Sequence, residues 1–414
     1  MRLIKDSIIY LSSSIINKSI PFFLLPILTN YLSPKEYGLL SIFLIVVTFY
    51  SAFIGMNINI NVSKNFFKCS KKELSIIIGN ILFILFFSFI LFFIVTLIGS
   101  IYIDTVFSIP KKWILIIPLI SYMFMVNTLN LTILRNEEKA LTFGIFEIVN
   151  TATTMSITIL LLVCYKFGWQ SQVIGILVSY FIFYIVSYIH MYRRGYITFK
   201  INSKTAKDIL KTSLPLIPHV LGGIVITVSD RLFIEHMINL EVVGIYSVGY
   251  TFGLVVILFT DAFIKAWSPW FYKNLVNPTD KKKRQIVKYT YAYIAAIFLL
   301  SILISLAAEF LLPYVVDERY VGAKIYIFWI ALGYAIHGIY KIFYPYLVHI
   351  NKTAFLGFSS VFAAVLNLIF NYVLIDSFGA IGAAYATILA FIASSLLVFS
   401  YQNRNYPMPW NLKK

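Results

Sequence analysis

Twelve long apolar runs follow one another along the chain, with short connections between them. A helix needs about 20 apolar residues to cross the hydrocarbon core of a bilayer, and each run is about that long. Charged residues make up 12% of the 414 residues, about half the share found in soluble domains. Such a chain cannot cover a surface that faces water, so we expect an all-α, polytopic membrane protein with twelve transmembrane helices.

The apolar runs set approximate limits for the twelve spans. The first run is too long for the apolar part of a cleaved signal peptide, and we read it as a retained helix. No connection is long enough to hold a soluble domain, which argues against a built-in ATPase or nucleic-acid domain. The predicted spans are Ser7–Tyr31, Gly38–Asn61, Leu74–Ile101, Trp113–Leu134, Leu141–Tyr165, Gln172–Tyr192, Thr212–Glu235, Gly244–Trp270, Ile286–Leu312, Ile325–Val348, Thr353–Ile375 and Ala380–Tyr401.

The distribution of Lys and Arg predicts the orientation in the membrane. The termini and every second connection carry a roughly fourfold excess of these residues over the opposite connections. This bias places both termini in the cytoplasm and explains most of the net charge of +17 without a nucleic-acid partner. The basic run Lys281–Arg284 is read as an anchor near anionic lipid; a substrate funnel is the other interpretation.

The two halves of the chain carry related segments. Ser33–Ile42 and Asn239–Val248 join equivalent spans at an offset of 206 residues, and shorter matches recur at offsets of 211 and 213. We therefore expect a six-plus-six duplication, with an N-terminal lobe over residues 1–206 and a C-terminal lobe over residues 207–414. Six spans per half give both lobes the same orientation, which is a parallel repeat and favours a substrate path between them.

The sequence carries no recognised catalytic pattern. P-loop, HExxH and CxxC motifs are missing, and the five histidines are scattered. No metal site or cofactor is expected. The extracytoplasmic connections are too short for the active-site loop of a polymerase or ligase. Charged residues inside the spans therefore carry the functional signal, because they are costly in lipid and usually face a cavity.

Lys18 lies deepest of these charges. It stands roughly 17 Å into the first span at about 1.5 Å per residue, beside Asn17 and before Pro21 and Pro26. Burying it costs about 2.5–3.5 kcal/mol, and a pyrophosphate oxygen about 4 Å away would return about 4 kcal/mol at an effective dielectric of 20. Lys18 either faces such a cavity, pairs with an acid or reaches the interface.

Three further cations lie within spans. Lys341 lies in the tenth span, about seven residues from its cytoplasmic end. Its side chain either faces the cavity or does not. Lys265 stands near interfacial tryptophans, which favours snorkelling over a cavity. Arg231 follows Asp230 near the outer end of the seventh span. It either forms a local ion pair, extends its charge to the membrane surface by snorkelling, or acts as a gate at the outer mouth. Because adjacent residues do not face each other on a helix, we expect these two to have different partners.

Two acids are candidates for ion coupling. Asp261 lies four residues before Lys265, a spacing that favours an ion pair within the helix. Glu147 lies on the fifth span. Either carboxylate is also a candidate for binding H⁺ or Na⁺ during transport.

Polar residues follow one face of the fifth span. Asn150, Thr154 and their neighbours recur at helical spacing. The repeat places Asn367 and Asn371 on the matching face of the eleventh span. These faces either line a water-filled vestibule or hold packed helices together by hydrogen bonds.

Pro215 and Pro218 stand early in the seventh span and are followed by Gly222 and Gly223. Proline removes a helical hydrogen bond and kinks or breaks the helix. We therefore expect a broken helix there, which would suit an element that moves.

Several short segments together resemble a known family. Tyr31–Gly38, Arg135–Lys139, Ser213–Pro218, Asp230–Arg231 and Gly244–Ser247 are similar to those of the polysaccharide-export flippases, the O-antigen and capsule repeat-unit translocases of the multidrug/oligosaccharidyl-lipid/polysaccharide exporter superfamily. The resemblance covers nearly the whole chain.

This resemblance implies a V-shaped pair of six-helix lobes around a cationic cavity. The cavity would accept the sugar–pyrophosphate head of an undecaprenyl-linked oligosaccharide while the tail stays in lipid, and alternating access would carry the head across the inner membrane. Lys18 is similar in position to cavity cations of lipid-flipping relatives. Candidate partners are the polymerase and chain-length proteins of polysaccharide biosynthesis.

Two other functions are compatible with a polytopic membrane protein. A drug/cation antiporter of the same superfamily should carry carboxylates at the cavity midplane, and Lys18 argues against it. A membrane glycosyltransferase or polymerase needs a catalytic loop that the sequence does not show. The preferred interpretation is a flippase, which makes no covalent bond.

Overall fold

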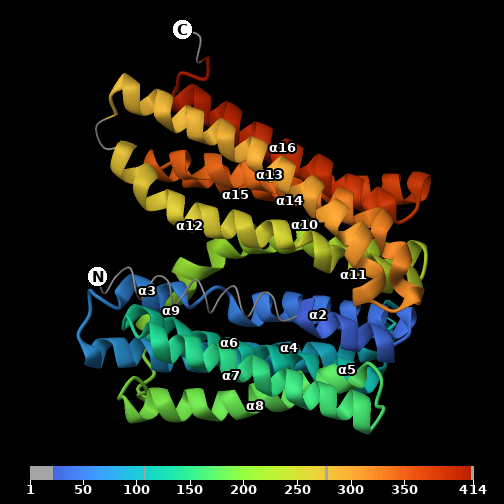
Figure 1. Ribbon diagram of the computed structural model, residues 1–414. Helices are drawn as coiled ribbons and strands as arrows, with labels where there is room; N and C mark the ends of the chain where they lie inside the picture. The colour runs from blue at the N-terminus through green and yellow to red at the C-terminus, as the bar shows by residue number, and fades with distance from the viewer. Residues whose placement is uncertain (1–21, 107, 276–277, 412–414) are drawn as a thin grey trace. The chain divides into compact units, whose positions relative to one another are not determined.

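The computed structural model describes residues 22–106, 108–275 and 278–411, and the regular elements within these ranges are helices (Figure 1). In this part of the chain, eleven helical segments are long and apolar enough to cross a membrane. The described part of the first predicted span is the helix Phe22–Tyr31. The protein is therefore an all-α polytopic membrane protein, as the apolar runs predicted.

Contacts along the chain divide it into two units. The first consists mainly of Leu39–Leu221, and the second of Gly222–Lys414 together with Leu28–Gly38. The duplication placed the division after residue 206, whereas the contacts place it about one helix later. The reason is that the helix of residues 203–213 packs on the first unit.

In the first unit, the fourth predicted span is the central helix. This helix, α6, packs against α4, α7 and α8, and its residues Tyr122, Val126, Leu129 and Ile133 are buried at helical spacing. The helices of this unit are α2 (Pro34–Gly55), whose residues up to Gly38 belong to the second unit, α3 (Ile60–Asn65), α4 (Lys71–Val106), α5 (Lys111–Ile114), α6 (Ile117–Asn136), α7 (Ala140–Ile159), a π turn (Leu160–Cys164), α8 (Gln170–Arg193) and α9 (Ser203–Ser213).

In the second unit, α14 takes the central place. It packs against α11, α12, α13 and α16. Small buried residues of α16, among them Ala383, Ala386 and Ala390, allow the close approach that membrane helices use. The helices of this unit are α10 (Ile217–Met237), α11 (Leu240–Gly253), α12 (Val255–Leu275), α13 (Asp280–Val315), a 3₁₀ turn (Glu318–Ala323), α14 (Lys324–His349), α15 (Thr353–Phe378) and α16 (Ile381–Asn405).

The seventh span is broken where its prolines predicted. A 3₁₀ turn, Leu214–Leu216, separates α9 from α10. The span begins earlier than the expected Thr212, because the preceding connection forms α9. Asn202 caps this helix by accepting hydrogen bonds from the backbone of Lys204 and Thr205.

The beginnings of α2 and α11 share the same design. Ser33 and Glu36 form a reciprocal capping box at the start of α2, and Asn239 caps α11. The two helix beginnings contact each other at Gly38 and Gly244. These glycines are separated by 206 residues, the offset between the two related segments, and the duplication stays a prediction.

Candidate functional site

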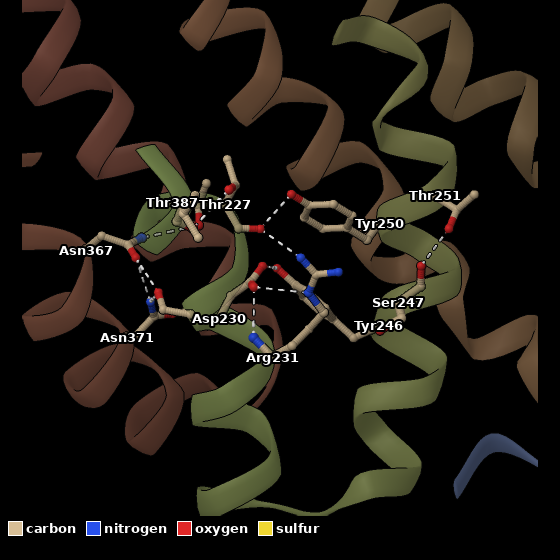
Figure 2. Close-up of polar contacts among 12 residues, drawn as sticks. Thr227, Asp230, Arg231, Tyr246, Ser247, Tyr250, Thr251, Asn367, Asn371 and Thr387 are labelled. Atoms are coloured by element: carbon tan, nitrogen blue, oxygen red, sulfur yellow. Dashed lines mark hydrogen bonds and ion pairs between the residues drawn. The ribbon is translucent and has the colours of Figure 1, made fainter. Parts of the chain in front are cut away.

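Asp230 and Arg231 of α10 form the centre of a buried polar network in the second unit (Figure 2). One carboxylate oxygen of Asp230 accepts a hydrogen bond from the backbone nitrogen of Arg231 at 2.8 Å. The other accepts from the hydroxyl of Tyr246 at 2.9 Å. The guanidinium Nε of Arg231 lies 3.4 Å from the first oxygen. The two charges therefore neutralise each other inside the unit.

The Arg231 side chain has further partners of its own. Its Nη2 donates to the carbonyl oxygen of Thr227 at 2.8 Å, and the guanidinium carbon lies 4.0 Å from the centre of the Tyr250 ring, in cation–π contact. The hydroxyl of Tyr250 also donates to Thr227 O and is hydrogen-bonded to Tyr334. A buried arginine surrounded in this way is satisfied locally.

We expected Asp230 and Arg231 to have different partners. Each does have partners of its own, but the two side chains also contact each other. The backbone positions do point to different sides, but the long arginine side chain reaches back to its neighbour's carboxylate. Of the roles that the sequence allowed for Arg231, the contact with Asp230 matches the local ion pair. The role of Arg231 in a gate stays a prediction.

Asn367 and Asn371 of α15 are fully buried. Asn367 accepts a hydrogen bond from Ser229 of α10 at 2.8 Å and from Asn371 at 3.0 Å, and donates to Thr387 of α16 at 3.4 Å. These amides connect three helices (Figure 2). The sequence allowed these amides either to hold packed helices together or to line a water-filled vestibule. The hydrogen bonds match the first role, and the second stays a prediction.

A second ion pair joins α12 to α14. Lys341 Nζ lies 2.5 Å from Asp261 Oδ1, and the two side chains are 19% and 26% exposed. This contact corrects the expected pair between Asp261 and Lys265. Lys265 shares a helix face with Asp261 but is exposed on α12, whereas Lys341 comes from the neighbouring helix and lies directly against the carboxylate.

The pair of Lys341 and Asp261 differs from the Arg231 network in its access to solvent. Both side chains are reachable from outside the packed unit, whereas Asp230 is 2% exposed. His337 stands one turn before Lys341, stacked on Tyr340 at 5.7 Å. The pair of Lys341 and Asp261 is thus the less buried of these two ion pairs.

The polar face of the fifth span lies in the first unit, on α7. Ser179 of α8 donates to the backbone oxygen of Asn150 at 2.8 Å and to its side-chain oxygen at 2.6 Å. Thr154 donates to the same backbone oxygen at 3.1 Å. Glu147 is partly buried on this helix. Part of the face thus holds α7 against α8.

The remaining predicted site residues are Asn17 and Lys18, which lie outside the described residues. Within the described ranges, no cluster of three His, Cys, Asp or Glu residues could hold a metal ion.

Sequence reasoning missed the tyrosines around Arg231. Tyr246 and Tyr250 are four residues apart on α11, and Tyr334 belongs to α14. The helical spacing of the first two was a signal that one face of α11 carries hydroxyl groups. Nothing in the sequence connects that face to α10.

A polar cluster outside the membrane spans was also missed. Glu137, after α6, accepts hydrogen bonds from Arg194 and from the hydroxyl of Tyr196. Burial, followed by the nearby Glu137 carboxylate, raises the pKa of Tyr196. The cluster ties the α6–α7 connection to the segment after α8.

Solved transporter structures share this fold. A multidrug resistance transporter of the MATE family, in an inward-facing conformation, matches with a TM-score of 0.74 at 12% identity, covering 94% of each chain. The lipid II flippase MurJ, in an inward closed conformation, matches with a TM-score of 0.74 at 15% identity, covering 96% of this chain and 87% of that one.

Two proteins of Haemophilus influenzae are similar in sequence. The Lsg locus putative protein 1 is 24% identical over 375 residues, covering 88% of this chain and 90% of the relative. An uncharacterized membrane protein is 24% identical over 372 residues, covering 89% of each. The family model described as polysaccharide biosynthesis protein matches residues 3–275. From this match and the fold, the chain belongs to the polysaccharide biosynthesis protein family.

Proposed function

We propose that the protein is a flippase, which moves an undecaprenyl-pyrophosphate-linked oligosaccharide from the cytoplasmic to the outer leaflet of the inner membrane. The observation that carries this proposal is the match of residues 3–275 to a polysaccharide biosynthesis family. The fold shared with a lipid II flippase supports it. The repeat unit belongs to an O-antigen or a capsule, and the protein makes no covalent bond.

The mechanism is a wet, cation-lined route for a polar head through hydrocarbon, opened by alternating access. Crossing the membrane is slow for such a head because charge is costly at the bilayer centre. In the proposed route, Lys18 receives the head near mid-depth and Lys341 provides a second cation. Both termini stand in the cytoplasm, as the Lys and Arg bias indicates.

Asp261 gives this route a way to use an ion gradient. While Asp261 is charged it balances Lys341 across their 2.5 Å contact. Protonation of Asp261 would leave Lys341 with an unbalanced positive charge that binds a phosphate oxygen. Glu147 is the second candidate for such coupling, with H⁺ or Na⁺ as the ion. Consumption of the flipped product is the other source of driving force.

The alternative function is that of a drug/cation antiporter. The observation that favours it is the fold shared with a MATE family transporter at the same TM-score of 0.74. A carrier of cationic drugs would use Asp261 without its lysine, and the direct pairing with Lys341 argues against an open carboxylate. We therefore prefer an anionic substrate.

The test is complementation of a strain that lacks the gene. Loss of the protein should abolish surface polysaccharide and leave lipid-linked oligosaccharide in the cytoplasmic leaflet. The wild-type chain should restore the polymer, Lys341→Gln should restore little of it, and Lys324→Gln should restore it fully. Lys324 is the matched control because it is exposed at the start of the same helix. Normal polymer without the protein would refute the proposal.

A further inference from the structure

An apolar groove runs along α4 in the first unit. It has a volume of about 380 Å³, and its walls include Phe83 and Phe86 of α4, Tyr122 of α6, and Tyr184 and Tyr188 of α8. A cavity of about 150 Å³ holds a benzene molecule, so this groove has room for a length of hydrocarbon chain. Its lining on α4 extends over about 10 Å, at about 1.5 Å per residue.

The extended segment of residues 197–201 closes one side of the groove. It crosses α4 closely, since a Cβ added to Gly79 would lie 2.0 Å from the carbonyl oxygen of Thr198. Asn80 accepts a hydrogen bond from the backbone nitrogen of Asn202 at 3.1 Å and so holds the segment in place. Phe199 and Ile201, which line the groove, are 76% and 57% exposed.

A polar cavity of about 530 Å³ lies at the beginning of α4, between α3 and α9. Its lining carries Lys64, Glu73, Asp208 and Lys211, and side-chain amides between them. Neither lysine forms an ion pair with a residue that the structure describes. Two positive and two negative side chains give the cavity no formal net charge.

The polar cavity and the apolar groove are neighbours on α4. Ile77 lines the cavity and Gly79 the groove, while the consecutive residues Ile201 and Asn202 line the groove and the cavity respectively. A polar site beside an apolar one on the same membrane helix fits an amphiphile whose head and chain occupy the two sites. The bilayer around the spans supplies amphiphiles with a phosphate head and long chains.

We propose that this face of the first unit binds one zwitterionic glycerophospholipid. The phosphate would lie with Lys64 and Lys211, the ammonium with Asp208, and one hydrocarbon chain along the aromatic groove. The balance of charge in the cavity favours a neutral head over an anionic one, because unmatched charge is costly at a partly desolvated site. The site is made by α3, α4, α6, α8 and α9 alone, and does not rest on the proposed transport function.

The experiment uses the full chain in vesicles of phosphatidylethanolamine and phosphatidylglycerol. A photoactivatable group is placed in the acyl chain of one lipid at a time, and the labelled peptides are mapped by mass spectrometry. The ethanolamine lipid should label the segment of residues 197–201 and the α8 tyrosines Tyr184 and Tyr188. Labelling by the glycerol lipid should be weaker there and should not exceed that of other lipid-facing helices.

The double variant Lys64→Gln, Lys211→Gln should lower groove labelling about tenfold, as expected when charged hydrogen bonds to a phosphate are lost. The matched control is Lys68→Gln with Lys204→Gln, since both are exposed lysines of the same two regions outside the cavity. The control should label as the wild type does. Both proteins are checked for an unchanged elution volume, and Phe199→Asn, on the exposed side of the segment, tests the chain contact independently.

Three results would overturn the proposal. Equal labelling by both lipids would remove the zwitterionic preference, and equal labelling in the two double variants would remove the headgroup cavity. Displacement of the label by an equimolar amount of polyprenyl phosphate would identify the transported carrier as the occupant. A failure of transport in the complementation test would leave all three readouts in place, so the two proposals fail separately.

Discussion

Gly38 and Gly244 approach each other's helices in the same way, at equivalent places of the internal repeat. A Cβ on Gly38 would lie 2.0 Å from the carbonyl oxygen of Leu240, and a Cβ on Gly244 would lie 1.9 Å from that of Pro34. Pro34 and Leu240 are themselves separated by the repeat offset of 206 residues. The contact is thus reciprocal, and glycine is required on both sides.

Adding a methyl group at either glycine should destabilise the protein. Gly38→Ala or Gly244→Ala pushes a Cβ into backbone that cannot move alone, and such overpacking costs about 1–3 kcal/mol. Thermal unfolding of the purified protein measures the loss. Gly223→Ala is the control because nothing lies within 4 Å of its added Cβ. Equal melting temperatures for Gly38→Ala and Gly223→Ala would refute the reciprocal contact.

Removing the buried cation of α10 should lower the free energy of unfolding more than the glycine substitutions do. Arg231→Ala leaves the Asp230 carboxylate buried without its charge partner, and breaking such a pair costs about 3–5 kcal/mol. The double variant Asp230→Ala, Arg231→Ala should cost less than the sum of the two single changes, because neither charge is then stranded. Denaturant-free thermal scans compare the variants with Arg404→Ala, an exposed arginine. Strict additivity would show that the pair does not interact.

Much of the fold could be predicted from the sequence, because the length of an apolar run is a local property. The spans and the kink at Pro215 followed from residues close in sequence, and the correspondence of Gly38 with Gly244 followed from the similarity of two separate segments. Helix α9 was missed because its lysine-rich face resembles a polar loop, and its packing on α3 and α4 is a tertiary contact.

The polar contacts inside the spans were harder to predict. Spacing within α12 favoured Lys265 as the partner of Asp261, but the structure brings in Lys341 from another helix. The partners of Arg231 on α11 were missed for the same reason. A sequence shows which face of a helix is polar, whereas the neighbour of that face depends on how the helices pack.

Neutralising Asp261 should strengthen binding of an anionic head. Asp261→Asn frees Lys341 from its 2.5 Å partner, so we expect about tenfold tighter binding of a polyprenyl pyrophosphate, or ~1.4 kcal/mol. Fluorescence polarisation with a labelled substrate measures it. Lys341→Gln should weaken the same binding. Weaker binding by Asp261→Asn would show that the carboxylate, and not the lysine, contacts the substrate.

Lys18 is predicted to carry the largest share of the proposed route. Lys18→Ala should abolish surface polysaccharide while the amount of protein in the membrane is unchanged. Lys18→Arg should retain more function than Lys18→Gln if charge is the requirement. Polymer yield and an immunoblot of the membrane fraction measure these outcomes. Normal polymer with Lys18→Ala would reject its role in the cavity.

The most direct measurement of the proposed function is transbilayer movement in vesicles that hold the purified protein alone. A fluorescent undecaprenyl-pyrophosphate-linked oligosaccharide is placed in one leaflet, and a membrane-impermeant quencher reports how much reaches the other. We expect rapid movement with the wild-type chain and slow movement with Lys341→Gln or with protein-free vesicles. Movement no faster than in protein-free vesicles, together with uptake of a cationic drug by the same preparation, would contradict the proposed function.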